Sequence, residues 1–348
     1  MWNYLSGNTP VESSSINDID KGEILDKGSF DEPFHGQTFE VSDEELTLIR
    51  AEIALKFPSE LHYLSPAYIL SVASKPYSKN PKVRRPLTYT TEKLCDLMNW
   101  RVESDAVNVQ ELVDIAKMGE PEATSKGVSR ERYEDACKLA ITMNNNSIYV
   151  HGYDKEGRPI IWLRTERKPW LLNDVNAEVN LHIIFSDIAI SFMPPGVTDF
   201  VVVADSTTPP PPSPSFLVST LKGLVRGYPD RLKMLYTAPL GTVLTTVLNL
   251  LLPIMPGALS TKLKLMNEKS EMQAVLPSVL DNGEDDIPTF FNGPCDHDRF
   301  YPSEGLGAEM NVDALGDGML MFDWDGMKER QMKMKEEWIK KHGTGDSD

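Results

Sequence analysis

The chain has 348 residues, of which 41% are hydrophobic, and a formal net charge of -17 at pH 7. This apolar content supports a sizeable core and excludes a wholly disordered chain. The acidic charge argues against binding to nucleic acid and against purely electrostatic attachment to anionic membranes.

The three cysteines, Cys95, Cys137 and Cys295, are too few and too widely spaced to form a disulfide framework. A reducing compartment suits them best. The first residues lack the basic and apolar pattern of a signal peptide, and no uninterrupted run of about 20 apolar residues is present. We therefore expect a cytoplasmic protein that meets membranes only peripherally.

The amino-terminal third divides into an acidic tail, residues 1–41, and a helical region over residues 42–145. Ser42, followed three residues later by Glu45, predicts a capping box that starts the first helix. Apolar residues recur at helical spacing in three stretches: Leu46, Ile49 and Ile53; Leu87, Leu94, Met98 and Val102; Leu112, Ile115 and Ala116. We expect no clear strands in this region.

After residue 146 the pattern changes to strands that alternate with helices. Residues 147–164 predict a strand, a turn at Asp154–Gly157 and a second strand. Asn173 or Asp174 then caps a helix, and the apolar run 200–205 predicts a strand that is buried on both faces. A helix, a strand at 231–237, an apolar helix at 240–252 and a strand at 262–266 follow. The fold class is therefore α/β, with a mixed, mainly parallel sheet flanked by helices.

The common catalytic signatures are missing: the sequence has no nucleophile elbow, P-loop, dinucleotide-binding glycine motif or zinc-protease motif. We expect no enzyme. The segment from Cys295 to Asp298 is the one dense group of metal-ligating residue types, but its adjacent spacing suits no common closed site. We predict a solvated loop there, an isolated His151, and no metal or cofactor.

The helix predicted at 240–252 is unusually apolar. Its hydrophobic residues occur at nearly every position: Leu240, Val243, Leu244, Val247, Leu248, Leu250, Leu251 and Leu252. A helix that is apolar all round is either fully buried or faces something apolar on its second side. Two interpretations follow, a core helix and a lid over an apolar cavity.

Five segments in order resemble the Sec14-like (CRAL-TRIO) lipid-binding family. They are GYDKEGRPIIWL at 152–163, FVVVADS at 200–206, GYPDRLKMLYTAP at 227–239, LPIMPGALSTKLKLM at 252–266 and IPTFFNG at 287–293. The resemblance implies a helical subdomain over 42–145, a lipid-binding domain over 146–295 that encloses an apolar pocket, and a carboxy-terminal extension over 296–348.

The same resemblance implies which residues hold the ligand. A mobile gate at 240–255 would close the pocket, with Leu244, Val247, Leu248, Leu251 and Leu252 as gate and pocket residues. Lys262, Asp230 and Lys75 match headgroup-binding positions of the family. The implied function is a carrier of one lipid, phosphatidylinositol or another phospholipid, that exchanges it at membranes. The alternative is a lipid-sensing scaffold that signals through protein partners.

Two segments are candidate protein ligands. Pro209–Pro214 is a stiff proline-rich stretch that either binds a partner or serves as a rigid loop. Residues 324–341 predict a basic amphipathic helix, whose apolar stripe consists of Trp324, Met327, Met334 and Trp338 and is interrupted by Gln331. This helix lies on a membrane, enters a partner's groove or packs on its own domain; we favour packing.

Overall fold

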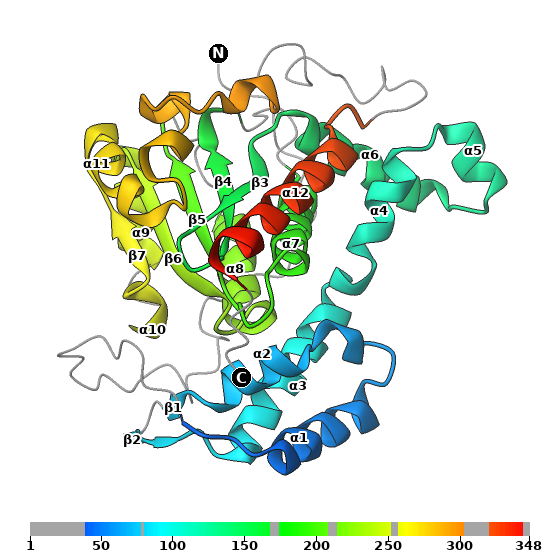
Figure 1. Cartoon of the computed structure of the whole chain (residues 1–348). Helices are drawn as coiled ribbons and strands as arrows, with labels where there is room; N and C mark the ends of the chain where they lie inside the picture. Colours follow the sequence, from blue (N-terminus) through cyan, green and yellow to red (C-terminus); the bar gives the residue numbers. More distant parts are fainter. Residues whose placement is uncertain are drawn as a thin grey trace.

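The computed structural model describes residues 39–77, 80–167, 174–207, 214–251, 257–302 and 320–343. Helices form the amino-terminal part, and a sheet with helices on both faces forms the rest (Figure 1). The amino-terminal part contains α1 (Asp43–Lys56), η2 (Leu61–Tyr63), α2 (Pro66–Ala73), β1 (Pro76–Tyr77), β2 (Asn80–Arg84), α3 (Leu87–Glu103), η3 (Ala106–Asn108), α4 (Val109–Ala116), α5 (Glu120–Ser125) and α6 (Arg130–Asn144).

The remaining elements build and cover the sheet. They are β3 (Ile148–Tyr153), β4 (Pro159–Arg164), η4 (Thr165–Arg167), α7 (Val175–Ser191), β5 (Phe200–Asp205), α8 (Pro214–Lys222), η5 (Gly223–Gly227), β6 (Leu232–Ala238), α9 (Thr242–Leu251), α10 (Gly257–Ser260), β7 (Leu263–Leu265), α11 (Lys269–Val279), η6 (Gly283–Asp286), η7 (Thr289–Phe291), η8 (His297–Arg299) and α12 (Trp324–His342).

The first helix begins as its sequence predicts. The Ser42 side chain accepts a hydrogen bond from the Glu45 amide, and the Glu45 carboxylate accepts one from the Ser42 amide, which confirms the capping box. In α3, Leu94 and Met98 are buried, but the prediction for Val102 is wrong because that side chain is 50% exposed. Eight residues beyond Leu94, Val102 is rotated by roughly 80° around the helix.

The amino-terminal region also contains a small hairpin, so the expectation that it has no strands is wrong. β1 and β2 pair in antiparallel register, with Pro76 opposite Arg84. Both strands contain proline, at Pro76 and Pro81, which is rare within strands and therefore hides the strand signal.

Two apolar cores hold the molecule together. The smaller core joins α1, α2 and α3 around Ile53, Tyr68 and Leu94. The larger core joins α4 and α6 to the sheet and to α7, and includes Leu112, Leu139 and many residues of the strands. The predicted helical region is thus divided between the two cores.

The larger sheet of the described residues has five strands in the order β3-β4-β5-β6-β7. β3 and β4 are antiparallel, and the other pairs are parallel, which confirms the predicted mixed, mainly parallel sheet. Because side chains alternate along a strand, β4 turns Ile161 and Leu163 to one face of the sheet and Ile160 and Trp162 to the other.

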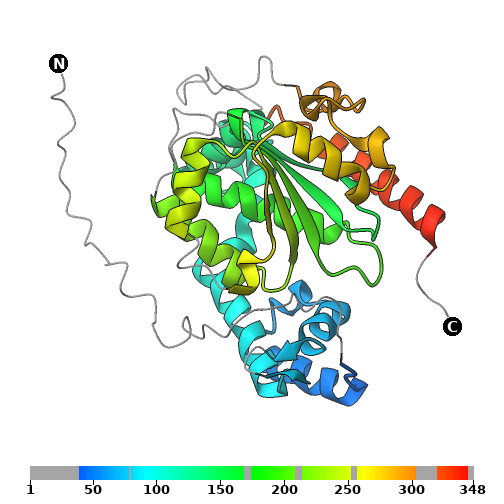
Figure 2. The ribbon, with the colours of Figure 1, turned by 90° about the vertical axis from the view of Figure 1, so that its left-hand side faces the viewer.

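Helices cover both faces of the sheet (Figure 2). α7 packs on β3 and β4, and α8 lies beside α7 on the same face. Asp174 caps α7 by accepting hydrogen bonds from the amides of Asn176 and Ala177, at 3.0 and 3.1 Å. On the opposite face α11 contacts β6, and α12 packs along the edge strand β3, where its Trp324 also meets Phe185 of α7.

Candidate functional site

Three basic side chains surround a single carboxylate where the amino-terminal helices meet the sheet. The Arg85 Nη1 lies 2.7 Å from the Asp230 Oδ2, the Lys93 Nζ lies 3.4 Å from the same oxygen, and the Lys75 Nζ lies 3.5 Å from the Oδ1. Lys75 follows α2, Arg85 follows β2, Lys93 belongs to α3, and Asp230 precedes β6. One carboxylate faces three cations, so the cluster has an excess of positive charge within an acidic protein.

Asp230 has an uncommon backbone conformation and a lowered pKa. Its φ is 63°, in the left-handed region, which Asp and Asn tolerate better than most residues. Burial disfavours the ionised carboxyl, but Lys93, Lys75 and Arg85 outweigh that effect and hold the pKa of Asp230 well below its usual range. The carboxylate is therefore charged at neutral pH.

Lys262 is a fourth cation next to this cluster. Its ammonium group donates a hydrogen bond to the carbonyl oxygen of Leu232. Burial lowers the pKa of Lys262, and the charge of Lys75 adds to this effect while Asp230 opposes it. These mutual effects place Lys262 in the same electrostatic environment as Lys75 and Asp230.

The structure thus brings together the three headgroup positions proposed from the sequence, Lys75, Asp230 and Lys262, and adds Arg85 and Lys93. Sequence reasoning missed these two because neither belongs to a resembling segment. The sequence held only an indirect signal. Arg85 stands just before the first residue of α3 and Lys93 lies within α3, but their ion pairs with Asp230 appear only when the chain is folded.

An apolar cavity of about 160 Å³ lies between the sheet and the helices on its α7 face. Among its lining residues are Ile161, Leu163, Phe200, Val202, Ile183 and Leu224. Leu232 also lines this cavity, and its carbonyl oxygen is the acceptor for Lys262. Lys262 therefore contacts a residue that borders the apolar cavity.

The predicted gate helix corresponds to α9. Its Leu248 is buried, with 9% of its surface exposed. Thr242, Thr245, Thr246 and Asn249 are exposed and follow one another at helical spacing. The expectation of a helix that is apolar on all sides is therefore wrong on this face, where four polar residues meet solvent. The side chains of the other predicted gate residues, Leu244, Val247, Leu251 and Leu252, lie outside the description.

Comparison with protein families assigns this architecture. Residues 143–293 match the model of the CRAL/TRIO domain, a range that begins at the end of α6 and includes all five strands of the sheet. The chain therefore contains a CRAL/TRIO domain over these residues. A search of curated proteins found no match. Among solved structures, the crystal structure of Sfh5 is similar, with 14% sequence identity and a TM-score of 0.44, over 73% of this chain and 93% of that one.

Proteins with a CRAL/TRIO domain are generally lipid-binding or lipid-transfer proteins and not enzymes, and the ligand of such a domain is a hydrophobic lipid. The apolar cavity lies inside the matched range and on its sheet. In the described part of the chain, no helix combines the length and the apolar character needed to cross a bilayer.

The prediction for the segment from Cys295 to Asp298 is wrong in one respect. His297 is not in a solvated loop: only 1% of its surface is exposed, and its imidazole packs against Tyr149 and Trp162 of the sheet and against Phe290 of η7. Asp298 is anchored by Arg164 and Arg167. His151 is not isolated either, since its ring centroid lies 4.5 Å from that of His297. The residues from Cys295 to Asp298 give no sign of this arrangement by themselves, because His151 belongs to β3, far away in the sequence.

Proposed function

We propose that this protein carries one anionic phospholipid, with its phosphate at the cluster of Lys75, Arg85, Lys93 and Lys262 and its apolar part in the cavity on the α7 face. In this proposal the protein is cytoplasmic and exchanges the lipid at the surface of membranes. The observation that carries the proposal is the position of Leu232, which lines the cavity and also holds Lys262 through its carbonyl oxygen.

The charges of the cluster suit a phosphate. Arg85 offers a planar guanidinium that hydrogen-bonds to two oxygens, and the lysines offer compact positive charges. Asp230 neutralises part of this charge in the absence of ligand and keeps the cations together. A half-buried site strengthens the attraction because water screens it less than at the surface.

The apolar cavity favours a lipid that enters by displacing a helix. Its volume of about 160 Å³ is close to that of an engineered cavity of about 150 Å³ that holds benzene. An acyl chain is much longer than benzene, so binding requires movement of the covering helices. Each methylene transferred out of water contributes about 0.8 kcal/mol, which offsets the cost of that movement. We assign the opening to α8 and α9.

The test compares two lysines of neighbouring positions. Lys262→Ala removes the cation next to the cavity, whereas Lys264→Ala removes an exposed lysine of β7, the strand that begins directly after Lys262. Full-length proteins are incubated with vesicles that contain phosphatidylcholine and phosphatidylinositol in equal amounts, and the bound lipid is counted by native mass spectrometry.

We expect the wild-type protein and Lys264→Ala to retain phosphatidylinositol in preference to phosphatidylcholine. Lys262→Ala should bind phosphatidylinositol roughly tenfold more weakly, because a charge-assisted contact contributes about 1.5 kcal/mol or more, while phosphatidylcholine binding persists. Equal loading of both lipids by all three proteins would remove Lys262 from the site. A wild-type protein that takes up no lipid would refute the carrier function.

A further inference from the structure

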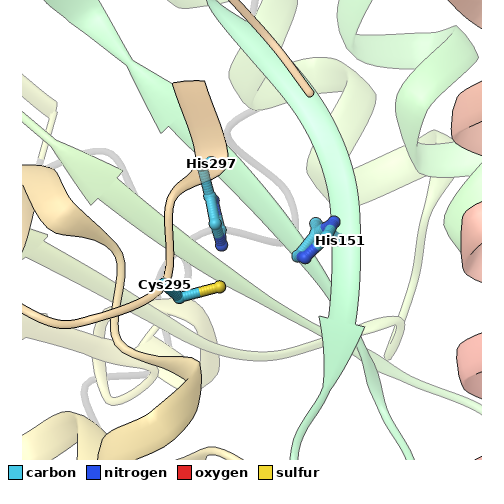
Figure 3. A group of neighbouring side chains, drawn as sticks. All are labelled: His151, Cys295 and His297. Carbon is cyan, nitrogen blue, oxygen red and sulfur yellow. The ribbon is translucent and has the colours of Figure 1, made fainter. Parts of the chain in front are cut away.

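Three metal-ligating side chains converge on the sheet face opposite to the apolar cavity. His151 projects from β3, Cys295 lies in the loop between η7 and η8, and His297 is the first residue of η8 (Figure 3). One potential ligand atom of each residue, a ring nitrogen or the sulfur, lies within 4.8 Å of the other two. The picture shows all three side chains directed into the same small space.

The loop that carries Cys295 and His297 is held in place by the protein itself. The Cys295 amide donates a hydrogen bond of 2.9 Å to the Ile287 carbonyl oxygen, and the Cys295 carbonyl accepts one of 2.9 Å from the Thr289 amide. One residue beyond His297, Asp298 is bound by Arg164 and Arg167 of the sheet region. The three side chains are therefore positioned before any ligand arrives.

The surroundings of His297 suit a metal ligand. Its side chain is almost fully buried, and its Nδ1 lies 3.0 Å from the Tyr149 hydroxyl. Within the described residues, its Nε2 has no hydrogen-bond partner. When Nδ1 donates to the Tyr149 oxygen, the lone pair of Nε2 is free to bind a metal, and such a second contact is typical of metal-bound histidines. A buried ring nitrogen without a partner is costly, and an ion would satisfy it.

We propose that His151, Cys295 and His297 form a binding site for a transition-metal ion of the zinc class. Two imidazoles and one thiolate are ligands that zinc and similar ions prefer, whereas calcium and magnesium require oxygen ligands. The Cys295 thiol binds as the thiolate and releases its proton to solvent.

The geometry needs only a small contraction. With metal–ligand bonds of about 2.0–2.3 Å, the ligand atoms of a tetrahedral site lie roughly 3.3–3.8 Å apart, compared with the limit of 4.8 Å here. A cavity of about 110 Å³ borders all three residues, and Asp281, Asp286 and Glu337 are among its lining residues. This cavity leaves a fourth position open to water or to a carboxylate.

This site is independent of the proposed lipid site. The Ile160 and Trp162 side of β4 borders the metal cavity, and the Ile161 and Leu163 side borders the apolar cavity. A bound ion would link the loop after η7 to β3, next to α12. Failure of lipid binding would therefore leave this proposal untouched, and the reverse holds as well.

The first test uses cobalt as a spectroscopic substitute for zinc. The full-length protein is freed of metal by dialysis against a chelator and titrated with Co²⁺, then with Zn²⁺ in competition. We expect one ion per chain and a sulfur-to-cobalt charge-transfer absorption. Cys295→Ser should abolish that absorption and His297→Gln should weaken Zn²⁺ binding at least about tenfold. Cys95→Ser, which changes a buried cysteine of α3, should behave like the wild type.

A second measurement needs no variant and covers the case in which a variant does not fold. Alkylation of each cysteine in the wild-type protein is followed by peptide mass spectrometry with and without Zn²⁺. We expect Zn²⁺ to slow the reaction of Cys295 specifically, with no effect on Cys95 or Cys137. Absence of stoichiometric binding, a charge-transfer absorption that persists in Cys295→Ser, or alkylation of Cys295 at an unchanged rate would each overturn the proposal.

Discussion

Asp230 is the residue on which the basic cluster depends. Its carboxylate is the shared partner of Lys75, Arg85 and Lys93, and 15% of its side-chain surface remains exposed. We predict that Asp230→Asn lowers the free energy of unfolding by about 2–3 kcal/mol, because removing one partner leaves buried charges unpaired. Asn tolerates the left-handed backbone at this position, so the change tests charge and not conformation.

The effect of Asp230→Asn should depend on pH in a defined direction. The pKa of Asp230 is lowered in the folded protein, so the unfolded chain takes up this proton first as pH falls. The stabilisation is therefore complete above pH ~4–5 and is lost progressively at lower pH.

Urea unfolding at pH 7 and near pH 3 tests this dependence. The difference in the free energy of unfolding between wild type and Asp230→Asn should be smaller at the lower pH. Glu122→Gln, which removes an exposed ion pair with Lys126, serves as the control and should change little at either pH. A pH-independent difference would contradict the ionic explanation.

Sequence reasoning reached only part of this residue-level picture. Lys262 and Asp230 stand in segments that resemble the family, so they could be named in advance. Arg85 and Lys93 could not, because a single charged residue on a helix or after a strand is ordinarily a solvated one. The same limit applies to His151 and His297, which are 146 positions apart in the chain and meet only through folding.

At the scale of elements, η5 shows how closely the two parts of the chain pack. Gly227 and Gly223 both face Trp100 of α3, which is 6% exposed. A Cβ atom on Gly227 would lie 2.2 Å from a ring carbon of Trp100, whereas one on Gly223 would lie 3.4 Å away. Only the first distance forces the indole or the helix to move.

We predict that Gly227→Ala destabilises the protein by about 1–3 kcal/mol, as expected for an overpacked contact. Gly223→Ala is the matched control in the same element against the same indole, and it should be neutral or slightly stabilising because alanine favours helices. Thermal unfolding followed by circular dichroism would compare the two. Equal melting temperatures for both variants would show that α3 and η5 adapt to each other more freely than this packing indicates.

The elements that sequence could predict are those with local signals. The capping box at Ser42, the cap at Asp174 and the turn at Asp154–Gly157 are set by neighbouring residues, and the structure contains all three. The exposed polar stripe of α9 was missed for a different reason. A count of apolar residues ignores their angular positions, and Thr245, Thr246 and Asn249 share one side of the helix.

At the scale of the whole molecule, α12 lies against the sheet and extends the large core. Trp324, Met327 and Gln331 are buried, and Phe185 of α7 packs against Trp324 with ring centroids 6.1 Å apart. Gln331, which interrupts the apolar stripe in the sequence, exchanges hydrogen bonds of 3.0 and 3.2 Å with the backbone of Gly152 in β3. Packing on its own domain is thus the arrangement in the structure, as we favoured. Residues 208–213, which include most of the proline-rich candidate ligand, lie outside the described part.

This packing predicts the outcome of truncation. Removing the residues after Gly318 deletes Trp324 and Met327 from the core, and loss of one buried large side chain alone costs roughly 3–5 kcal/mol. We expect the melting temperature to fall by about 10 °C or more, with vesicle binding no weaker than in the intact chain. Truncation after His342, which keeps all of α12, is the control and should melt like the full-length protein. An unchanged melting temperature together with weaker vesicle binding would mean that α12 serves the membrane and that its contact with β3 contributes little.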